Sequence, residues 1–567
     1  MATVENNETI PQLIVSGKWE KAVLEEKPRQ KLEENILPAY FKQRRWFGGK
    51  ARALEQAQII EVISINKGSS VVYLLFCEIQ YTEGQPEVYL LPITLAAGKK
   101  AKAILETAPA GVIARLKTTD AEGILYDGVY EKAFQQALLG TISRKQRRKG
   151  NQGELIASHG KIFRELMSEL ALPLESQVLK SEHSNTAILF GEKLFFKLFR
   201  RLEEGIHPDL EISAFLTEKT SYANTPKLAG ALEYHKVGSE PMVVGLLQTY
   251  VPNEGDAWTY TLASIGRYFE RVLSPKHEIL PPPTFPSALL KLAFEEIPPI
   301  AQELIGGIYL ERAKLLGKRT AELHLALSAN VEDPNFSPEP FSMRYQRSIY
   351  QSMQSAARRN LQLLRKNLKN LPEGLKKDAE EILSLEKEIM DRFAVILQKK
   401  ISAMKIRIHG DYHLGQVLYT GSDFVMIDFE GEPARALSER RLKHSPFRDV
   451  AGMIRSFHYA VYTGLFQHPS MRQADIPVLI PWTELWYNYV AAAFLRSYLD
   501  TAGDAPFMPK AHDEFDSLLQ VFLLEKAIYE LGYELNHRPD WLRIPISGIQ
   551  HLLGASSQPN GQTTVST

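Results

Sequence analysis

Short runs of β-forming residues dominate the first half of the chain, whereas apolar residues at helical spacing dominate the second half. Near the N-terminus, runs rich in Val, Ile and Tyr are separated by Gly or Asn, which is typical of a small antiparallel sheet. The runs cover residues 58–65, 70–80 and 87–93, and a helix is expected over 131–139. We therefore expect a β-rich domain over residues 32–152, preceded by a linker-like segment over 1–31.

A second β-rich unit is expected over residues 153–255, and the pattern is mostly helical over 256–553. The predicted elements of the unit over 153–255 are strands over 176–180, 186–190, 194–199 and 242–250, and a helix over 209–217. Charged segments over 359–400 favour amphipathic helices of the same domain over a partner-binding coiled coil. The tail over 554–567 has the Ser-, Gln-, Thr- and Gly-rich composition of a disordered segment. The order indicates an α+β chain in which a small β-rich domain precedes a β-rich lobe and a helical lobe.

The composition limits which partners the protein is expected to bind and where in the cell it is expected to act. The 567 residues include 67 Lys and Arg and 67 Asp and Glu, so no excess charge favours nucleic acid or an anionic membrane. No apolar run approaches the ~20 residues that span a bilayer, and the N-terminus lacks an apolar signal core. The single cysteine, Cys77, lies in an apolar run, which favours a buried core residue over a catalytic thiol. We expect a cytoplasmic protein that binds neither nucleic acid nor membrane.

The segment over residues 408–430 contains the residues with the clearest chemistry. Protein kinases carry His-x-Asp, an Asn five residues after that Asp, and then Asp-Phe. Here Asp411 follows His409 by two residues, Gln416 follows Asp411 by five, and Asp428 precedes Phe429. A β-hairpin over 417–427 is expected between the two acidic residues.

This spacing suits the transfer of a phosphoryl group to a hydroxyl. Asp411 would accept the proton of the attacking hydroxyl, while Asp428 and Gln416 offer the oxygen ligands that Mg²⁺ prefers. Taken alone, Asp411 fits a turn residue and Asp428 fits a helix cap. The combined pattern favours catalysis with ATP and Mg²⁺.

The β-rich lobe carries the candidate residues for nucleotide binding. Lys197 lies among apolar residues of a predicted strand, where a charge needs a partner, and Glu211 on the next helix is the expected one. An exposed strand lysine is the alternative. The Gly-x-Gly-x-x-Gly loop is missing, so hydroxyl, amide and backbone groups are expected to hold the phosphates, with the adenine near the end of the strand over 242–250. The residues expected there are Ser184, Asn185 and Thr186 for the phosphates, and Gln248 and Tyr250 for the adenine.

A face of one predicted helix could contact a sugar. Lys526, Tyr529 and Tyr533 lie at i, i+3 and i+7 and share that face. Aromatic rings stack on pyranose faces, but a packed helix face with polar tips at the surface fits the same spacing. His413 and Arg448 are further candidates for this cleft, although Arg448 and Asp449 equally fit a structural ion pair.

Several segments in order resemble maltokinases, which are related to aminoglycoside phosphotransferase-like kinases, and in particular the form fused behind trehalose synthase. The matching segments are 44–50, 184–186, 196–201, 206–211, 408–433, 440–453 and 526–541. The resemblance implies ATP-dependent phosphorylation of maltose to maltose 1-phosphate, which feeds α-glucan synthesis from trehalose. It also implies an N-terminal cap domain before a bilobal protein-kinase-like fold, and places the helix that carries Lys526 in the maltose site.

Two other functions fit the same residues. A kinase of this fold could act on another sugar or small alcohol, such as glucose or glucosamine, because the catalytic core is shared. A non-catalytic subunit that docks on trehalose synthase is the second alternative, because no synthase domain precedes Met1 and the first residues look like a linker.

Overall fold

The computed structural model describes residues 10–67, 70–119, 122–169, 173–179, 184–274, 289–467, 472 and 474–554. Its contacts divide the chain into two compact units. The β-rich unit comprises residues 1–217, 226–252 and 436–438, and the helical unit comprises 218–225, 253–435 and 439–567. The expected disordered tail lies outside the described residues beyond Gly554.

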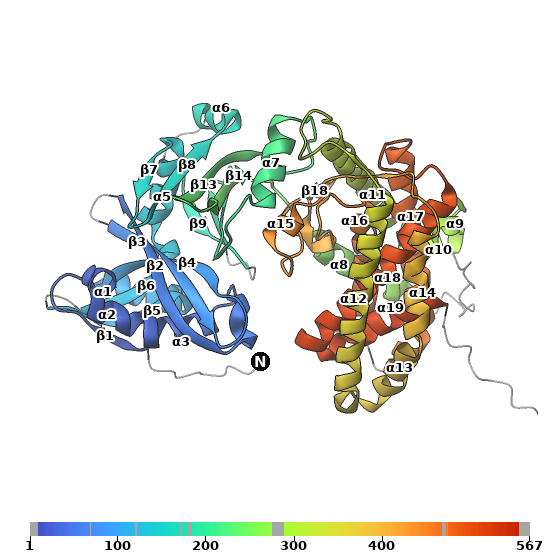
Figure 1. The fold of residues 1–567 in the computed structure, drawn as a ribbon, viewed down its shortest axis with the longest axis horizontal. Helices are drawn as coiled ribbons and strands as arrows, with labels where there is room; N and C mark the ends of the chain where they lie inside the picture. The colour runs from blue at the N-terminus through green and yellow to red at the C-terminus, as the bar shows by residue number, and fades with distance from the viewer. Residues whose placement is uncertain are drawn as a thin grey trace, which may run out of the picture. The chain divides into compact units, whose positions relative to one another are not determined.

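The N-terminal sheet of the β-rich unit follows the order β1-β5-β6-β4-β3-β2, with β12 paired to β4 (Figure 1). Its strands are β1 Gln12–Ile14, β2 Leu54–Lys67, β3 Ser70–Tyr81, β4 Glu87–Ala97, β5 Val112–Lys117, β6 Glu122–Asp127 and β12 Arg201–Leu202. The helical segments of this region are α1 Lys21–Leu24, α2 Glu26–Lys31, η1 Leu32–Ile36, α3 Leu37–Gln43, η2 Gly48–Ala51, α4 Gly98–Thr107, η3 Pro109–Gly111 and η4 Gly128–Tyr130. The three predicted strands correspond to β2, β3 and β4. Cys77 on β3 is fully buried, and burial raises the pKa of its thiol, as expected of a core residue.

The segment before Leu32 corrects the prediction of a linker. Leu13, Val15, Ala22 and Val23 are buried in the same core as the sheet residues. β1 is an edge strand that pairs in parallel with β5, from Gln12 opposite Arg115 to Ile14 opposite Lys117. A strand of three residues is too short to show a periodicity in the sequence. Its pairing partner lies about a hundred positions further along the chain, so the local sequence does not indicate the pairing either.

The second sheet of this unit is antiparallel, with the order β7-β8-β13-β14-β11-β10-β9. Its strands are β7 Arg147–Lys149, β8 Gly153–His159, β9 Ser176–Val178, β10 Thr186–Phe190, β11 Leu194–Leu198, β13 Leu228–Lys236 and β14 Met242–Thr249, and its helices are α6 Lys161–Glu169 and α7 Pro208–Glu218. Helix α5, Lys132–Ser143, contacts strands of both sheets. A single hydrophobic core therefore joins them, with Phe76 and Leu90 of the first sheet and Ile188 and Phe196 of the second.

The helical unit consists mainly of long helices. They are α8 Ala257–Val272, α9 Leu289–Phe294, α10 Pro299–Ile305, α11 Gly307–Ser328, α12 Met343–Asn367, η5 Leu368–Asn370, α13 Glu373–Ser384, α14 Glu386–Ala394, η6 Val395–Leu397, α16 Phe447–Gln467, α17 Ile476–Ala502, α18 His512–His537, η8 Pro539–Trp541 and α19 Arg543–Leu553; α15 Leu437–Arg440 crosses the boundary between the units. Two small antiparallel pairs join β15 Glu339–Pro340 to β16 Met404–Lys405 and β17 Val417–Tyr419 to β18 Phe424–Met426. The expected hairpin over 417–427 corresponds to β17 and β18, which follow the single-turn helix η7 Leu414–Gln416.

Helix packing explains the charged segment over 359–400. On α12, the apolar residues Ile349, Met353, Ala357, Leu361 and Leu364 are buried, and their three- to four-residue spacing forms one stripe. The stripe packs within the unit, where α12 contacts α14 and α18. The structure confirms amphipathic helices of this domain. Among the described residues, no helix is long and apolar enough to cross a membrane.

Candidate active site

A buried carboxylate anchors the loop that carries Asp411. Asp449, in the first turn of α16, accepts hydrogen bonds from the backbone N–H groups of His409 at 2.8 Å and Gly410 at 2.9 Å. Its carboxylate also lies 3.1 Å from Nε2 of His324, whose Nδ1 is 2.9 Å from the hydroxyl of Tyr498. Burial acts to raise the pKa of Asp449, but these hydrogen bonds outweigh burial and hold the pKa below its usual value.

Backbone geometry completes this anchor. Gly410 adopts a φ of 84°, in the left-handed region that glycine enters without steric cost. Asp449 had been considered as a partner of Arg448, but it binds the loop instead, while Arg448 pairs with Glu525 at 3.1 Å. Asp449 therefore holds the loop that carries Asp411, a contact that the kinase motif does not predict. Its signal in the sequence is only an acidic residue in the first turn of a helix.

Asp411 is partly exposed, with 24% of its side chain accessible. Two cationic or titratable groups face it: Nζ of Lys526 at 3.8 Å and Nε2 of His413 at 4.0 Å. Both distances exceed a hydrogen bond, so the carboxylate stays accessible to a substrate hydroxyl. Asp411 can serve as a general base from this position.

The residues expected to hold Mg²⁺ lie at the open end of the β17–β18 hairpin. The carbonyl of Gln416 accepts a hydrogen bond from the N–H of Ile427 at 3.1 Å, so Gln416 lies beside the start of the Asp428 segment. Asp428 adopts a φ of 62°, a left-handed conformation that non-glycine residues rarely take and that often marks a functional position. The ring of His409 supports this segment, because Nε2 donates to the carbonyl of Ile427 at 2.8 Å.

Glu430 adds a carboxylate that the sequence analysis left without a role. Carboxylate oxygens of Asp428 and Glu430 lie within 4.8 Å of one another. Two carboxylates this close offer the oxygen ligands that fit a hard cation such as Mg²⁺. The motif alone does not show this, because in the kinase pattern a glycine follows Asp-Phe where this chain has Glu430.

Asp411 opens onto a cavity of about 410 Å³ in the helical unit. The cavity is formed by the catalytic loop, the segment after Phe429, and helices α12, α16 and α18. Of the predicted sugar-binding residues, Arg448, Lys526 and Tyr529 line it. Burial, followed by the nearby Glu432, raises the pKa of Tyr529, so its hydroxyl remains a hydrogen-bond donor at neutral pH.

Two predicted sugar residues lie elsewhere. Tyr533 is outside the cavity lining and is 41% exposed, with its ring stacked on His537 at 4.4 Å. It shares the helix face of Lys526, but seven residues displace it about 10 Å along the axis. His413 also lies outside the lining, and its Nδ1 accepts a hydrogen bond from the N–H of Gly415 at 3.1 Å.

Most acidic side chains of the cavity are paired with nearby cations. Glu432 bonds to Arg435 at 2.7 Å, Glu525 to Arg448 at 3.1 Å, and Asp411 faces Lys526. Glu439, which also lines the cavity, is exposed to solvent. The interior therefore offers paired charges and an aromatic ring rather than a carboxylate without a counter-charge.

In the β-rich unit, Lys197 lies on β11 and is 5% exposed. Its Nζ donates to the carboxylate of Asp209, in the first turn of α7, at 2.8 Å. The prediction had assigned this role to Glu211. Residues two apart on a helix point in different directions, so when Asp209 faces the strand, Glu211 does not share that face. The expectation that a buried strand lysine needs a helix carboxylate is met by Asp209, two positions before Glu211.

The predicted phosphate-binding residues are tied to Arg200 in the structure. The Nε of Arg200 donates to the Thr186 hydroxyl at 2.7 Å, and its backbone N–H lies 3.4 Å from the Asn185 side-chain oxygen. Ser184 is exposed. Thr186 and Asn185 therefore fix the start of β10. Among the residues that the structure describes, Ser184 and backbone groups remain as candidates for binding the phosphates.

The predicted adenine region lies at the end of β14. Gln248 is buried and its side-chain amide donates to the Ser213 hydroxyl at 3.3 Å. The N–H of Tyr250 donates to the carbonyl of Lys193 at 2.8 Å. Since this N–H is used within the protein, a nucleotide would have to use other groups of this segment.

Arg200 also connects the two sheets. Its guanidinium donates to the carboxylate of Asp127 at the end of β6 at 2.6 Å, and both side chains are at least 97% buried. Arg200 lies 4.8 Å from the ring of Trp46, and its Nη1 donates to the carbonyl of Leu90 at 3.4 Å. One buried cation thus links the N-terminal sheet to the β10 segment.

Comparison with known proteins identifies the N-terminal region. Residues 40–131 match the maltokinase N-terminal cap domain. This region, called the cap domain from here on, contains strands β2 to β6 and Asp127. This match confirms the cap domain that was expected to precede the two lobes.

Over most of its length, the chain is similar to glucosamine kinases. One from Streptacidiphilus jiangxiensis is 22% identical over 379 residues, covering 66% of this chain and 72% of that protein. One from Mycolicibacterium smegmatis is 23% identical over 380 residues, covering 66% and 78%. A solved glucosamine kinase in complex with glucosamine, ADP and inorganic phosphate superposes with a TM-score of 0.57 at 16% identity, covering 95% of this chain and 100% of that one. A second crystal form of a glucosamine kinase gives a TM-score of 0.59 at 17% identity. The chain therefore has a bilobal, kinase-like α+β fold with a maltokinase-type cap domain.

The buried pair between the cap domain and Arg200 predicts a large stability effect. Asp127→Asn leaves the Arg200 guanidinium buried without its counter-charge, and removing one partner of such a pair costs about 3–5 kcal/mol. We expect a lower midpoint of thermal unfolding, measured by calorimetry of the full chain. Glu122→Gln is the matched control. Glu122 lies on β6, as Asp127 does, but its pair with Lys117 is exposed. Equal midpoints for the two variants would contradict the prediction.

Proposed function

We propose that this protein is a maltokinase that uses ATP and Mg²⁺ to convert maltose to maltose 1-phosphate. The observation that carries the proposal is the accessible carboxylate of Asp411 at the edge of a cavity lined by Lys526, Tyr529 and paired charges. Within this proposal, the maltose comes from a separate trehalose synthase, and the product feeds α-glucan synthesis. The protein acts in the cytoplasm.

Asp411 would accept the proton of the anomeric hydroxyl as its oxygen attacks the γ-phosphorus. The new O–P bond forms while the bond to the β-phosphate oxygen breaks, and ADP leaves with that electron pair. Asp428, Glu430 and Gln416 would hold Mg²⁺, which neutralises charge on the phosphates when bound. Lys197, oriented by Asp209, would bind the phosphates in the β-rich unit.

The cavity chemistry supports a neutral sugar. An amino sugar carries an ammonium group, which is recognised best by a carboxylate without another partner. Here Glu432 and Glu525 already bind arginines. The ring of Tyr529 offers a surface on which a pyranose can stack, while Lys526 can donate to sugar hydroxyls.

Glucosamine is the second candidate substrate, because the proteins similar to this chain over most of its length are named glucosamine kinases. A glucosamine kinase of this fold would need the exposed Glu439 or a rearranged ion pair to hold the amino group.

A panel of acceptors distinguishes these functions. With ATP and Mg²⁺, we expect kcat/KM for maltose to exceed that for glucosamine by at least about 10-fold, the lower end of what even a small difference between substrates decides in a binding pocket. The panel also contains glucose, trehalose and an aminoglycoside, with ADP release as the readout and ³¹P NMR to identify the phosphorylated position. Methyl maltoside, which lacks the free anomeric hydroxyl, is the control and should not react. A preference for glucosamine, or phosphorylation of methyl maltoside, would reject the proposal.

A further inference from the structure

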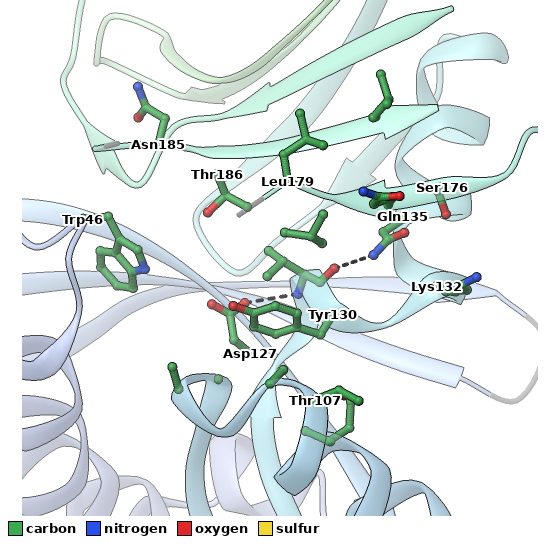
Figure 2. Close-up of a pocket in the computed structure, with 18 of the residues that line it drawn as sticks. Trp46, Thr107, Asp127, Tyr130, Lys132, Gln135, Ser176, Leu179, Asn185 and Thr186 are labelled. Atoms are coloured by element: carbon green, nitrogen blue, oxygen red, sulfur yellow. Dashed lines mark hydrogen bonds between the residues drawn. The ribbon is translucent and has the colours of Figure 1, made fainter. Parts of the chain in front are cut away.

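A second cavity, larger than the one beside Asp411, lies within the β-rich unit between the cap domain and strands β9 and β10. Its volume is about 790 Å³, within the ~300–1,000 Å³ of ordinary small-molecule sites. Figure 2 shows Trp46 and Asn185 toward one end and Lys132, Gln135 and Ser176 toward the other, with Tyr130 between them. None of the residues assigned to catalysis or to the sugar lines this cavity.

Two cations of the cavity wall have carboxylate partners. Arg200 pairs with Asp127 at 2.6 Å, and Lys132 lies 3.6 Å from Glu175. The guanidinium of Arg44 stacks on the ring of Tyr40 at 4.5 Å and donates to the Tyr40 carbonyl. A strongly anionic ligand would have to displace these partners. The pairing therefore favours a neutral ligand.

The uncharged lining suits hydroxyl-rich ligands. The rings of Trp46 and Tyr130 provide flat apolar surfaces, and amide and hydroxyl side chains surround them. Gln135 and Ser176 are 3% and 6% exposed, and Gln135 Oε1 and Ser176 Oγ have no hydrogen-bond partner among the described residues. Buried polar atoms are seldom left in this state, since an unmade hydrogen bond costs about 1–3 kcal/mol. Both atoms are themselves inaccessible, so they belong to the wall behind the cavity and do not decide which ligand enters it.

We propose that this cavity binds a neutral oligosaccharide at a site separate from the one where the sugar is phosphorylated. Aromatic faces beside amide and hydroxyl groups are the chemistry that recognises pyranose chains. The oligosaccharide class follows from the cavity, and the choice of an α-1,4-linked glucose chain rests on the proposed function.

Binding at this site would reach the nucleotide-binding lobe through Arg200. Trp46 and Asn185, which line the cavity, both contact Arg200, which in turn bonds to Thr186 at the start of β10. An oligosaccharide that touches Trp46 and Asn185 would therefore act on the segment that precedes Lys197. The expected consequence is a change in KM for ATP on addition of the oligosaccharide.

Calorimetric titration of the full chain with methyl maltotetraoside tests the proposal, because this probe cannot be phosphorylated at its blocked anomeric position. Thr107→Trp places a large ring at the cavity edge and should weaken binding by at least 10-fold. Lys102→Trp is the matched control, since Lys102 is exposed on the same helix outside the lining. Gln177→Trp on β9 blocks the cavity from the opposite side and guards against a folding defect of the first variant.

The outcomes separate this inference from the proposed function. Binding that is lost in both blocking variants and kept in the control supports the inference, even if the acceptor panel rejects maltose. Binding that is unchanged in the blocking variants, or lost equally in the control, overturns it, even if maltose is phosphorylated. Tighter binding of inorganic phosphate than of the oligosaccharide at this cavity would also overturn it.

Discussion

An Asp411→Asn variant is expected to bind ATP almost as tightly as the parent protein while its kcat falls by about 10²–10⁴-fold, the usual contribution of a general base. The amide preserves the shape of the side chain but cannot accept the proton of the sugar hydroxyl. The two groups that face Asp411, Lys526 and His413, would remain in place. Steady-state kinetics for kcat and calorimetric titration with ATP measure the two effects separately.

Asp391→Asn provides the matched control for this variant, because Asp391 is exposed on α14 and does not line the cavity. It should leave both quantities unchanged. If Asp411→Asn kept the kcat of the parent, Asp411 would not be the base, and the proposed mechanism would be wrong.

Asp449→Asn is expected to lower kcat by about 10²-fold, because small displacements of a catalytic group have effects of this size. The carboxylate accepts from two backbone N–H groups of the catalytic loop and lies beside His324. An amide has one oxygen for these donors, and its own N–H₂ group would face another donor. The loop that carries Asp411 would therefore lose its fixed position.

The kinetic pattern distinguishes positioning from a general loss of structure. We expect kcat to fall far more than the KM values for sugar and ATP, with the folded fraction checked by circular dichroism at the assay temperature. Asp500→Asn, at an exposed position of α17, is the control. A kcat within two-fold of the parent would show that Asp449 does not hold the loop.

Local sequence patterns predict the structure where an element and its functional residues lie close together in the chain. The bounds of β10 match the expected strand over 186–190, and the β17–β18 hairpin lies between Gln416 and Asp428 as predicted. Helical spacing also placed Lys526 and Tyr529 together on α18, where both line the cavity. In each of these examples, a residue periodicity or a fixed spacing within about twenty residues determines where the element or side chain lies.

Long-range pairings set the limits of prediction. Arg200 bonds to Asp127, which lies 73 positions earlier, so no local pattern shows that Thr186 serves this arginine rather than a phosphate. The parallel pairing of β1 with β5 has the same character. Which acidic residue of α7 bonds to Lys197 depends on the rotation of α7 about its axis, which two acidic residues in the same turn do not define.

The inaccessible thiol of Cys77 makes this chain convenient for attaching spectroscopic labels. Maleimide and methanethiosulfonate reagents attack thiolates at the surface, and this sulfur is both enclosed by the β3 core and held in its protonated form. A fluorophore pair on cysteines introduced at exposed positions, one in the cap domain and one on α13, would therefore report only the intended sites. Energy transfer between the two dyes would report whether the distance between the labelled sites changes when nucleotide and sugar are added.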